Sequence, residues 1–273
     1  SRFALGFGNY NNLILDYGSS VSLDKRQNVD WFIFYDGLLK NINNSFVDTK
    51  QSNLNLNISH QFSTNKRNSF SQINFRQHRQ SFYGLPSVIE DNYIFSNFDP
   101  IQRLTYFSIT SDWKWHDRIV KGFSLNSYYT ADSYSTRENE VSFSSKFQLD
   151  LGSINLTAIP KINILSTTFK EDFYTRLEND FFSGIGGVSV YSSKEKGKFK
   201  FKLGIQSYLI TGDSYTEKNL YYFPDIMITF KPENSNFAPF LNLNGEFYQN
   251  SFRALSHSNP YIAPAIRLRS SFS

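Results

Sequence analysis

The chain has 273 residues with a net charge of +4, and 40% of its residues are hydrophobic. No stretch approaches the roughly 18 consecutive apolar residues of a transmembrane helix. These residues include no Cys, which excludes disulfides, thiolate metal sites and a Cys nucleophile. Lys and Arg are dispersed among acidic residues, which disfavours a nucleic-acid-binding surface. The length suits one large β domain spanning residues 1–273.

Aromatic residues are abundant, with 28 Phe and 17 Tyr against one Met. Phe and Tyr favour strands, and they also populate the interfacial girdles of membrane barrels. Helical periodicity is nearly absent, whereas apolar and polar residues alternate with a period of two from end to end. In residues 53–63, for example, Leu54, Leu56 and Ile58 share one face, and Asn and Ser residues share the other. The sequence therefore predicts an all-β fold.

The alternating runs are about 10 residues long, the length that a tilted strand needs to cross a bilayer. Strands of soluble proteins more often stop at about five or six residues. About 14 strands are predicted (range about 12–16), and an even number is typical of a single-chain bacterial barrel. In chain order they start near Phe3, Leu13, Trp31, Asn53, Ser71, Thr105, Phe123, Glu140, Ile154, Gly184, Phe199, Phe223, Phe237 and Ile262. Pro160 and Pro224 fall inside two of these runs and predict a bulge or a strand end, because proline has no N–H for the ladder.

The predicted connections alternate between short and long. The short ones are residues 24–28, 64–68, 116–122, 152–153, 192–197 and 232–236, and the long ones are 41–51, 80–100, 166–180, 211–222 and 249–261, with 133–139 intermediate. The alternation calls for a long loop at the first break, residues 9–12, but this connection is too short for one and is therefore not expected to be a true turn. Outer-membrane barrels have short periplasmic turns and long extracellular loops. The pattern therefore predicts a transmembrane antiparallel up-and-down β-barrel.

The polar face of the predicted strands carries charges of both signs. These charges are Asp16, Arg76, Asp112, Lys114, Asp132, Lys146, Asp150, Lys161, Lys200, Lys202, Asp225 and Glu246. An Arg or Lys facing lipid at the bilayer midplane costs about 2–4 kcal/mol, so we expect these side chains to face the lumen. Salt bridges among Asp112, Lys114, Asp132, Lys146 and Asp150 would then plug it. The alternative is the solvated outer face of a soluble sheet.

The three tryptophans, Trp31, Trp113 and Trp115, all lie next to predicted short turns. Indole rings prefer the membrane–water interface, so these residues predict an interfacial belt at the periplasmic end. Three ordinary buried tryptophans are the alternative interpretation.

Catalytic motifs are absent from the sequence. The four histidines are His60, His78, His116 and His257, and only His78 alternates with other residues of the expected lumen face. Neither a G-x-S-x-G elbow nor an H-E-x-x-H zinc motif occurs. Acidic pairs such as Glu90-Asp91 and Glu171-Asp172 are expected to be solvated loop charges rather than calcium ligands. We therefore predict a protein that is not an enzyme and has no metal or cofactor.

Four short motifs add a family resemblance. Gly6-Phe7-Gly8-Asn9-Tyr10 opens a strand, Ser81-Phe82-Tyr83-Gly84 closes one, Asn139-Glu140-Val141 begins another, and Ser258-Asn259-Pro260-Tyr261 follows the last loop. This order resembles an outer-membrane β-barrel family of Bacteroidota, often labelled TonB-dependent-receptor-like or porin-like. The chain is too short for the roughly 22 strands and plug domain of a true receptor. The resemblance implies a barrel in the outer membrane of a Gram-negative bacterium, and assigns no substrate.

Two functions are compatible with these patterns. The first is a structural or accessory subunit of a larger outer-membrane assembly, such as protein insertion, secretion or uptake machinery. Its partners would be outer-membrane lipid, lipopolysaccharide and other outer-membrane or periplasmic proteins, and no nucleic acid. The second is a passive porin-like channel or transporter for small solutes. Lumen charges of both signs favour the first, because they suit mutual pairing better than an ion-selective ring.

Overall fold

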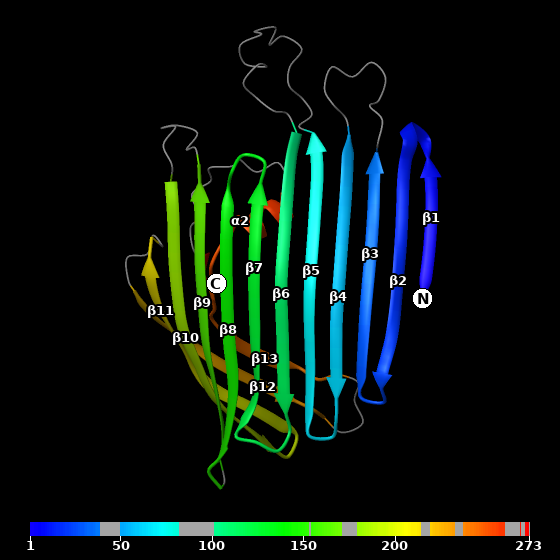
Figure 1. Ribbon diagram of the computed structural model, residues 1–273. Helices are drawn as coiled ribbons and strands as arrows, with labels where there is room; N and C mark the ends of the chain where they lie inside the picture. The colour runs from blue at the N-terminus through cyan, green and yellow to red at the C-terminus, as the bar shows by residue number, and fades with distance from the viewer. Residues whose placement is uncertain are drawn as a thin grey trace.

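The computed structural model describes residues 1–38, 50–81, 101–152, 154–170, 179–213, 219–232, 237–259, 268 and 271–272. Thirteen strands form one antiparallel sheet in which each strand pairs with the next along the chain (Figure 1). Their bounds are β1 Arg2–Gly8, β2 Asn12–Asp24, β3 Gln27–Leu38, β4 Gln51–Ser63, β5 Arg67–Ser81, β6 Ile101–Trp115, β7 Val120–Asp132, β8 Arg137–Asp150, β9 Asn155–Phe169, β10 Asn179–Lys196, β11 Phe199–Gly212, β12 Leu220–Phe230 and β13 Phe240–Asn244. The short strands β14 (Phe247–Tyr248) and β15 (Ser271–Phe272) pair separately, and one helix, α2, spans Phe252–Ser258.

The predicted strands are confirmed for the first thirteen positions. The fourteenth, near Ile262, lies outside the described residues. Most of the strands are longer than the alternating runs suggested: β5 and β6 have 15 residues each, or about 50 Å at about 3.3 Å per residue. Tilt shortens the distance that a strand spans along the membrane normal, and a strand of this length is long enough to cross a roughly 30 Å hydrocarbon core even when it is tilted.

The bulge or strand end predicted at Pro160 and Pro224 is not found, because both lie inside strands that keep their register; each is instead placed where its missing N–H is not needed. Pro224 precedes the first β12 residue that pairs with β13, so its N–H-free nitrogen lies at the open edge of β12. Beside Pro160 the β8–β9 pairing is interrupted between the pairs Ser144–Lys161 and Phe147–Ala158, with no change of register.

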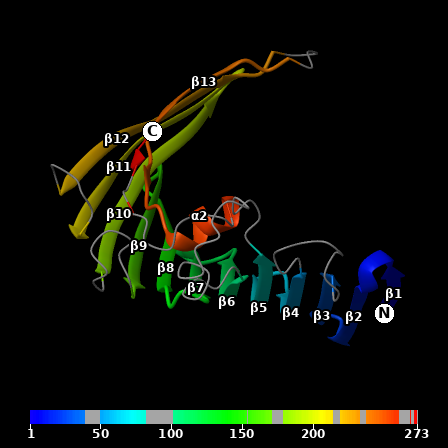
Figure 2. The same ribbon diagram turned by 90° about the horizontal axis from the view of Figure 1, so that it is seen from above.

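The predicted closure into a barrel is not found among the described residues. The sheet is open, with β1 at one edge and β13 at the other (Figure 2). Thirteen alternating strands leave β1 and β13 running in the same direction, so they cannot pair antiparallel with each other. After β13 the chain turns away from the sheet at Gly245, where any Cβ would collide with the ring of Phe223. Glycine at position 245 therefore permits the close approach of the backbone to the Phe223 ring.

The connections sort to the two ends of the sheet as the alternation predicted. The turns after β2, β4, β6, β8 and β10 lie at one end, which we call the short-turn end (Figure 1). Residues 39–49, 82–100, 171–178 and 214–218 lie outside the described residues, as do 233–236 of the short-turn end. One prediction was wrong: residues 9–11 form a 3-10 turn that joins β1 to β2. The predicted long connection 249–261 contains α2, which the sequence patterns did not indicate.

The sheet is curved, and α2 lies on its concave side (Figure 2). Cross-strand neighbours point to the same face, so the registers assign each strand residue to the concave or the convex face. The two buried apolar clusters are small, and both involve concave-facing residues together with the segment after β13. No helix among the described residues is long and apolar enough to span a membrane.

Candidate functional site: a helix docked on the concave face

In the part of the chain that the structure describes, the seat of α2 is a densely bonded site. The helix begins at Phe252, and the side chain of Ser251 caps it by accepting a hydrogen bond from the Ala254 N–H at 3.1 Å. A helix leaves its first N–H groups without intrahelical partners. Here the remaining partners come from the sheet rather than from water.

The Glu138 carboxylate of β8 receives the helix. It accepts hydrogen bonds from the backbone N–H groups of Phe252 at 2.6 Å and Arg253 at 2.8 Å. The Thr167 hydroxyl of β9 donates to the same carboxylate at 2.8 Å. Glu138 is 1% exposed, and a carboxylate in such a place must be hydrogen-bonded to be tolerated. The sheet and the first turn of α2 therefore satisfy one another.

Arg253 adds a second attachment. Its guanidinium forms an ion pair with Glu140 of β8 at 2.8 Å and lies 4.0 Å from the ring centre of Tyr128 on β7. The side chains of Arg253 and Glu140 are 30% and 12% exposed, so the pair is sheltered on one side. Charged and aromatic groups from two adjacent strands thus fix the orientation of the helix.

Apolar contacts complete the seat. Phe252 is fully buried and packs edge-on against Phe169 of β9, with ring centres 6.1 Å apart. Leu104, Leu165 and Leu268 belong to the same cluster. Burial of a Phe side chain contributes about 1.5–3 kcal/mol. The helix is therefore held by apolar burial as well as by hydrogen bonds.

A cavity of about 470 Å³ lies beside α2 and extends over β3 to β6. Its lining includes the stacked rings of Phe32 and Phe34, and Arg76 and His78 of β5. His257 at the end of α2 also lines it, with its Nδ1 atom 3.5 Å from the Arg76 guanidinium. The cavity is open to one side and mixes polar with aromatic groups.

The strand registers place the predicted lumen charges on the concave face. These are Asp16, Arg76, Asp112, Lys114, Asp132, Lys146, Asp150, Lys161, Lys200, Lys202 and Asp225. Glu246 follows β13, and one of its carboxylate oxygens lies 3.8 Å from the Lys161 ammonium. The concave face therefore gathers these charges from across the sheet.

The predicted salt bridges among Asp112, Lys114, Asp132, Lys146 and Asp150 are not those that form in the described part of the chain. There the ion pairs are Arg2–Asp16, Lys161–Glu246, Lys202–Asp225 and Arg253–Glu140. Asp132 instead accepts hydrogen bonds from the backbone of Tyr134 and Thr136 and closes the β7–β8 turn. Alternation predicts the face of a charge, whereas pairing also depends on the register of neighbouring strands.

The convex face is apolar along the middle of the strands. Leu203 and Ile205 of β11 are 58% and 52% exposed there, and Ile58 of β4 is 55% exposed. Convex-facing charges in the described strands lie only near strand ends. They are Asp24, Arg67, Arg79, Arg103, Arg137, Asp180, Lys194 and Lys196. An exposed apolar surface spread over thirteen strands far exceeds what a soluble monomer presents.

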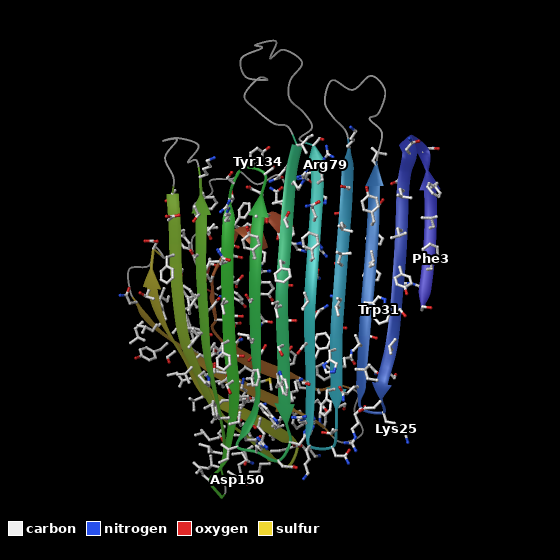
Figure 3. The ribbon with its side chains drawn as sticks, in the orientation of Figure 1. Phe3, Lys25, Trp31, Arg79, Tyr134 and Asp150 are labelled. Carbon is white, nitrogen blue, oxygen red and sulfur yellow. The ribbon has the colours of Figure 1, made fainter. Side chains whose placement is uncertain are left out.

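The tryptophans lie on the convex face. Trp113 stacks on Phe123 with ring centres 5.8 Å apart, and Trp115 lies 5.7 Å from the same ring. Trp31 lies on β3 above the first short turn (Figure 3). The indole N–H of Trp113 donates to the Ser111 hydroxyl at 2.9 Å. All three side chains are partly exposed rather than buried.

The histidines do not assemble a catalytic group in the described residues. His78 is hydrogen-bonded between Asn53 and Gln80, and His60 contacts Gln27 on the convex face. His116 lies in the β6–β7 turn. No cluster of three potential metal-ligating side chains occurs within the part of the chain that the structure describes.

Sequence reasoning missed the residues that hold α2, namely Glu138, Glu140, Ser251 and Arg253. A signal existed for the two carboxylates. Their cross-strand neighbours are Thr130 and Thr167 for Glu138, and Tyr128 and Leu165 for Glu140, with no cation among them. Two acids on a polar face without a cationic neighbour indicate a partner from elsewhere in the chain.

No protein-family model and no curated protein sequence matches this chain.

Proposed function

We propose that this chain forms the wall of a β-barrel in a bacterial outer membrane and acts as a structural or accessory subunit, with α2 occupying the interior. The observation that carries the proposal is the separation of the two faces: apolar outside, charged and hydrogen-bonded inside. This arrangement is inverted relative to a soluble barrel and typical of a membrane barrel. The family resemblance to Bacteroidota outer-membrane barrels agrees with it.

Membrane insertion requires that the two free edges find partners, because unpaired backbone groups are costly in lipid. Since β1 and β13 run in the same direction, antiparallel closure needs an odd number of further strands. A total of 14 is the smallest solution, and it is even as in single-chain bacterial barrels. A second copy in the same membrane orientation cannot supply this closure, because its edge strands also run in that direction.

The position of α2 favours a closed interior over an open pore. The helix and its seat span β6 to β9 on the side that would become the lumen. The packed helix narrows the interior beside these strands whether or not the lumen charges pair. We therefore assign the work of the protein to its outer surface and loops, where partner proteins of a larger assembly would bind.

Planar-bilayer recording of the purified protein tests this proposal. We expect no steady conductance from the wild-type protein and discrete openings after Glu138→Ala, because the variant loses the acceptor that holds α2. Flotation with liposomes after an alkaline wash serves as the control for insertion. Steady conductance of the order of a nanosiemens from the inserted wild-type protein would contradict the accessory role.

That outcome would favour a passive channel for small solutes, the second candidate. The cavity of about 470 Å³ beside α2 supports it, because Arg76 and His257 lie at its wall. A solute path past the helix would follow this cavity, and Arg76→Gln would then alter the anion preference of the conductance.

A further inference from the structure

The short-turn end carries a concentration of basic side chains, which we call the basic rim. Its members are Lys25, Arg26, Lys66, Arg67, Arg118, Lys121, Lys194 and Lys196, and all except Lys121 are exposed. Lys25 marks the rim in Figure 3. None of the eight forms an ion pair with a carboxylate in the described ranges. The rim therefore has charge available for an external partner.

The acidic residues of the same turns, Asp24, Asp117 and Glu195, are fewer than the rim cations and form no ion pair with them in the described ranges. Asp24 accepts hydrogen bonds from the Arg26 backbone N–H at 2.6 Å and the Gln27 amide, so its carboxylate is engaged in the turn. Glu195 pairs with Lys200 in the register and faces the concave side. The convex side of β10 at this level presents Lys194 and Lys196 instead.

Aromatic rings lie directly behind the rim on the convex face. The Arg67 guanidinium is 4.5 Å from the ring centre of Phe62 and 6.0 Å from that of Trp113. Trp113, Trp115 and Phe123 are in mutual contact. Indole rings prefer the headgroup level of a bilayer. This stacking places Arg67 at the same height as the rings, on the outside of the wall.

The opposite end is built differently. Its convex cations in the described strands are Arg79, Arg103 and Arg137, and they share that end with Asp180 and Asp213. The Asp213 carboxylate accepts a hydrogen bond from the Phe182 N–H at 2.8 Å, which holds one negative charge at that end of the sheet. At the short-turn end, by contrast, the convex cation Arg67 lies against two aromatic rings.

We propose that the basic rim and the aromatic cluster behind it bind the phosphate groups of anionic glycerophospholipids in the adjoining leaflet. This proposal rests on the proposed function, because it needs the convex face in a bilayer. An occupant must carry negative charge for the rim and an apolar tail for the surface below it, and an anionic phospholipid has both. An acidic protein would meet the charge but leave the adjacent Ile and Phe side chains exposed.

The energetic expectation follows from charge near a membrane surface. Each Lys or Arg close to an anionic leaflet contributes attraction worth about a fivefold preference, and salt weakens it. Arg67 also places its guanidinium against two rings, and an Arg stacked in this way loses less conformational freedom on binding phosphate. Removal of several rim cations should therefore reduce lipid selectivity without changing the strand pairing.

Reconstitution into nanodiscs of phosphatidylcholine with brominated phosphatidylglycerol tests the proposal. Bromine near the headgroup quenches nearby indoles, so wild-type tryptophan fluorescence should report enrichment of the anionic lipid. The variant Arg67→Gln/Lys194→Gln/Lys196→Gln should lose at least about fivefold of this enrichment. The matched control is Arg103→Gln/Arg137→Gln/Lys170→Gln, which removes the same charge at the opposite end and should retain it.

Equal enrichment around the rim variant and the wild-type protein would overturn the proposal, as would an equal loss in the control variant. Heat-modified gel mobility of each variant shows whether it is folded. A wild-type protein that fails to float with liposomes, whether or not they contain phosphatidylglycerol, would instead refute the membrane assignment. The two failures are therefore distinguishable.

Discussion

The convex and concave faces of the sheet are built from alternate residues of the same strands, yet their side chains differ: the convex face is apolar and the concave face is charged and hydrogen-bonded. On β8, Phe143 lies on the convex face with 41% of its surface exposed, whereas its neighbour Ser142 on the concave face takes part in a hydrogen bond with Asn126. The convex face leaves large apolar groups partly exposed. The concave face binds a helix, and its charged side chains form several ion pairs. This difference between the faces is the one that the proposed membrane wall requires.

The largest expected effect comes from a charge placed on the convex face. Phe143→Arg should destabilise the membrane-inserted protein by about 2–4 kcal/mol, whereas Ser142→Arg faces the concave side and should cost far less. The measurement is the fraction folded in liposomes against urea concentration. Phe143→Leu controls for the loss of the ring contact with Phe123. Equal destabilisation by both arginines would break the comparison between the faces.

The second-largest effect is expected from substitutions that release α2 from the sheet. Glu138→Ala removes the acceptor of two backbone N–H groups, and hydrogen bonds to a charged group contribute about 1.5–3 kcal/mol. Ser256 is 1% exposed under the helix, so Ser256→Cys should react slowly with a maleimide and much faster in the Glu138→Ala background. Glu138→Gln retains one acceptor oxygen and should give an intermediate rate. Unchanged labelling in all three proteins would show that Glu138 does not hold the helix.

The ion pair between Arg253 and Glu140 should contribute less. Both groups are partly exposed, so we expect a coupling energy of about 1 kcal/mol in a double-mutant cycle with Arg253→Met and Glu140→Gln. Tyr128→Leu should remove a further contribution of about 0.5–1 kcal/mol from the cation–π contact. The readout is again the maleimide rate at Ser256→Cys. Additive effects of the two single substitutions would mean that the pair does not couple α2 to β8.

The smallest expected effect concerns Lys202 and Asp225 on adjacent strands of the concave face. Their side chains are 27% and 8% exposed at an N–O distance of 2.7 Å, and Lys202 also lies 4.3 Å from the Tyr191 ring centre. Lys202→Met/Asp225→Asn should destabilise the protein by about 1 kcal/mol or less, because removing both charges leaves neither unpaired and a sheltered ion pair gains little beyond its desolvation cost. Urea titration at low and high salt checks this. An effect larger than that of Phe143→Arg would reverse the ranking of the two faces.

Much of the fold could be predicted because a strand's face depends only on local alternation. The thirteen confirmed strands and the positions of Asp16, Lys161 and Lys202 on one face follow from the period of two. Closure could not be predicted in the same way. It depends on the number of strands and on the path of the chain after β13, where Gly245 lets the backbone pass close to the Phe223 ring. These are long-range properties that no single run of residues encodes.

The seat of α2 was missed for a related reason. A helix of seven residues has too few turns for a clear hydrophobic period. Its anchors on the sheet, Glu138 and Glu140, are more than a hundred residues away in sequence from Arg253. The salt bridges predicted from spacing failed because Asp132 serves a turn and because other charges pair according to register.

The central claim is that the convex face contacts lipid and the concave face does not. Spin labels placed singly along β8, from Val141 to Leu149, test it most directly through accessibility to oxygen, which concentrates in lipid, and to a water-soluble nickel complex. We predict oxygen maxima at Val141, Phe143, Phe147 and Leu149, and nickel access only at the alternate positions Ser142, Ser144 and Lys146. The opposite phase, or nickel access at Phe143, would contradict the account.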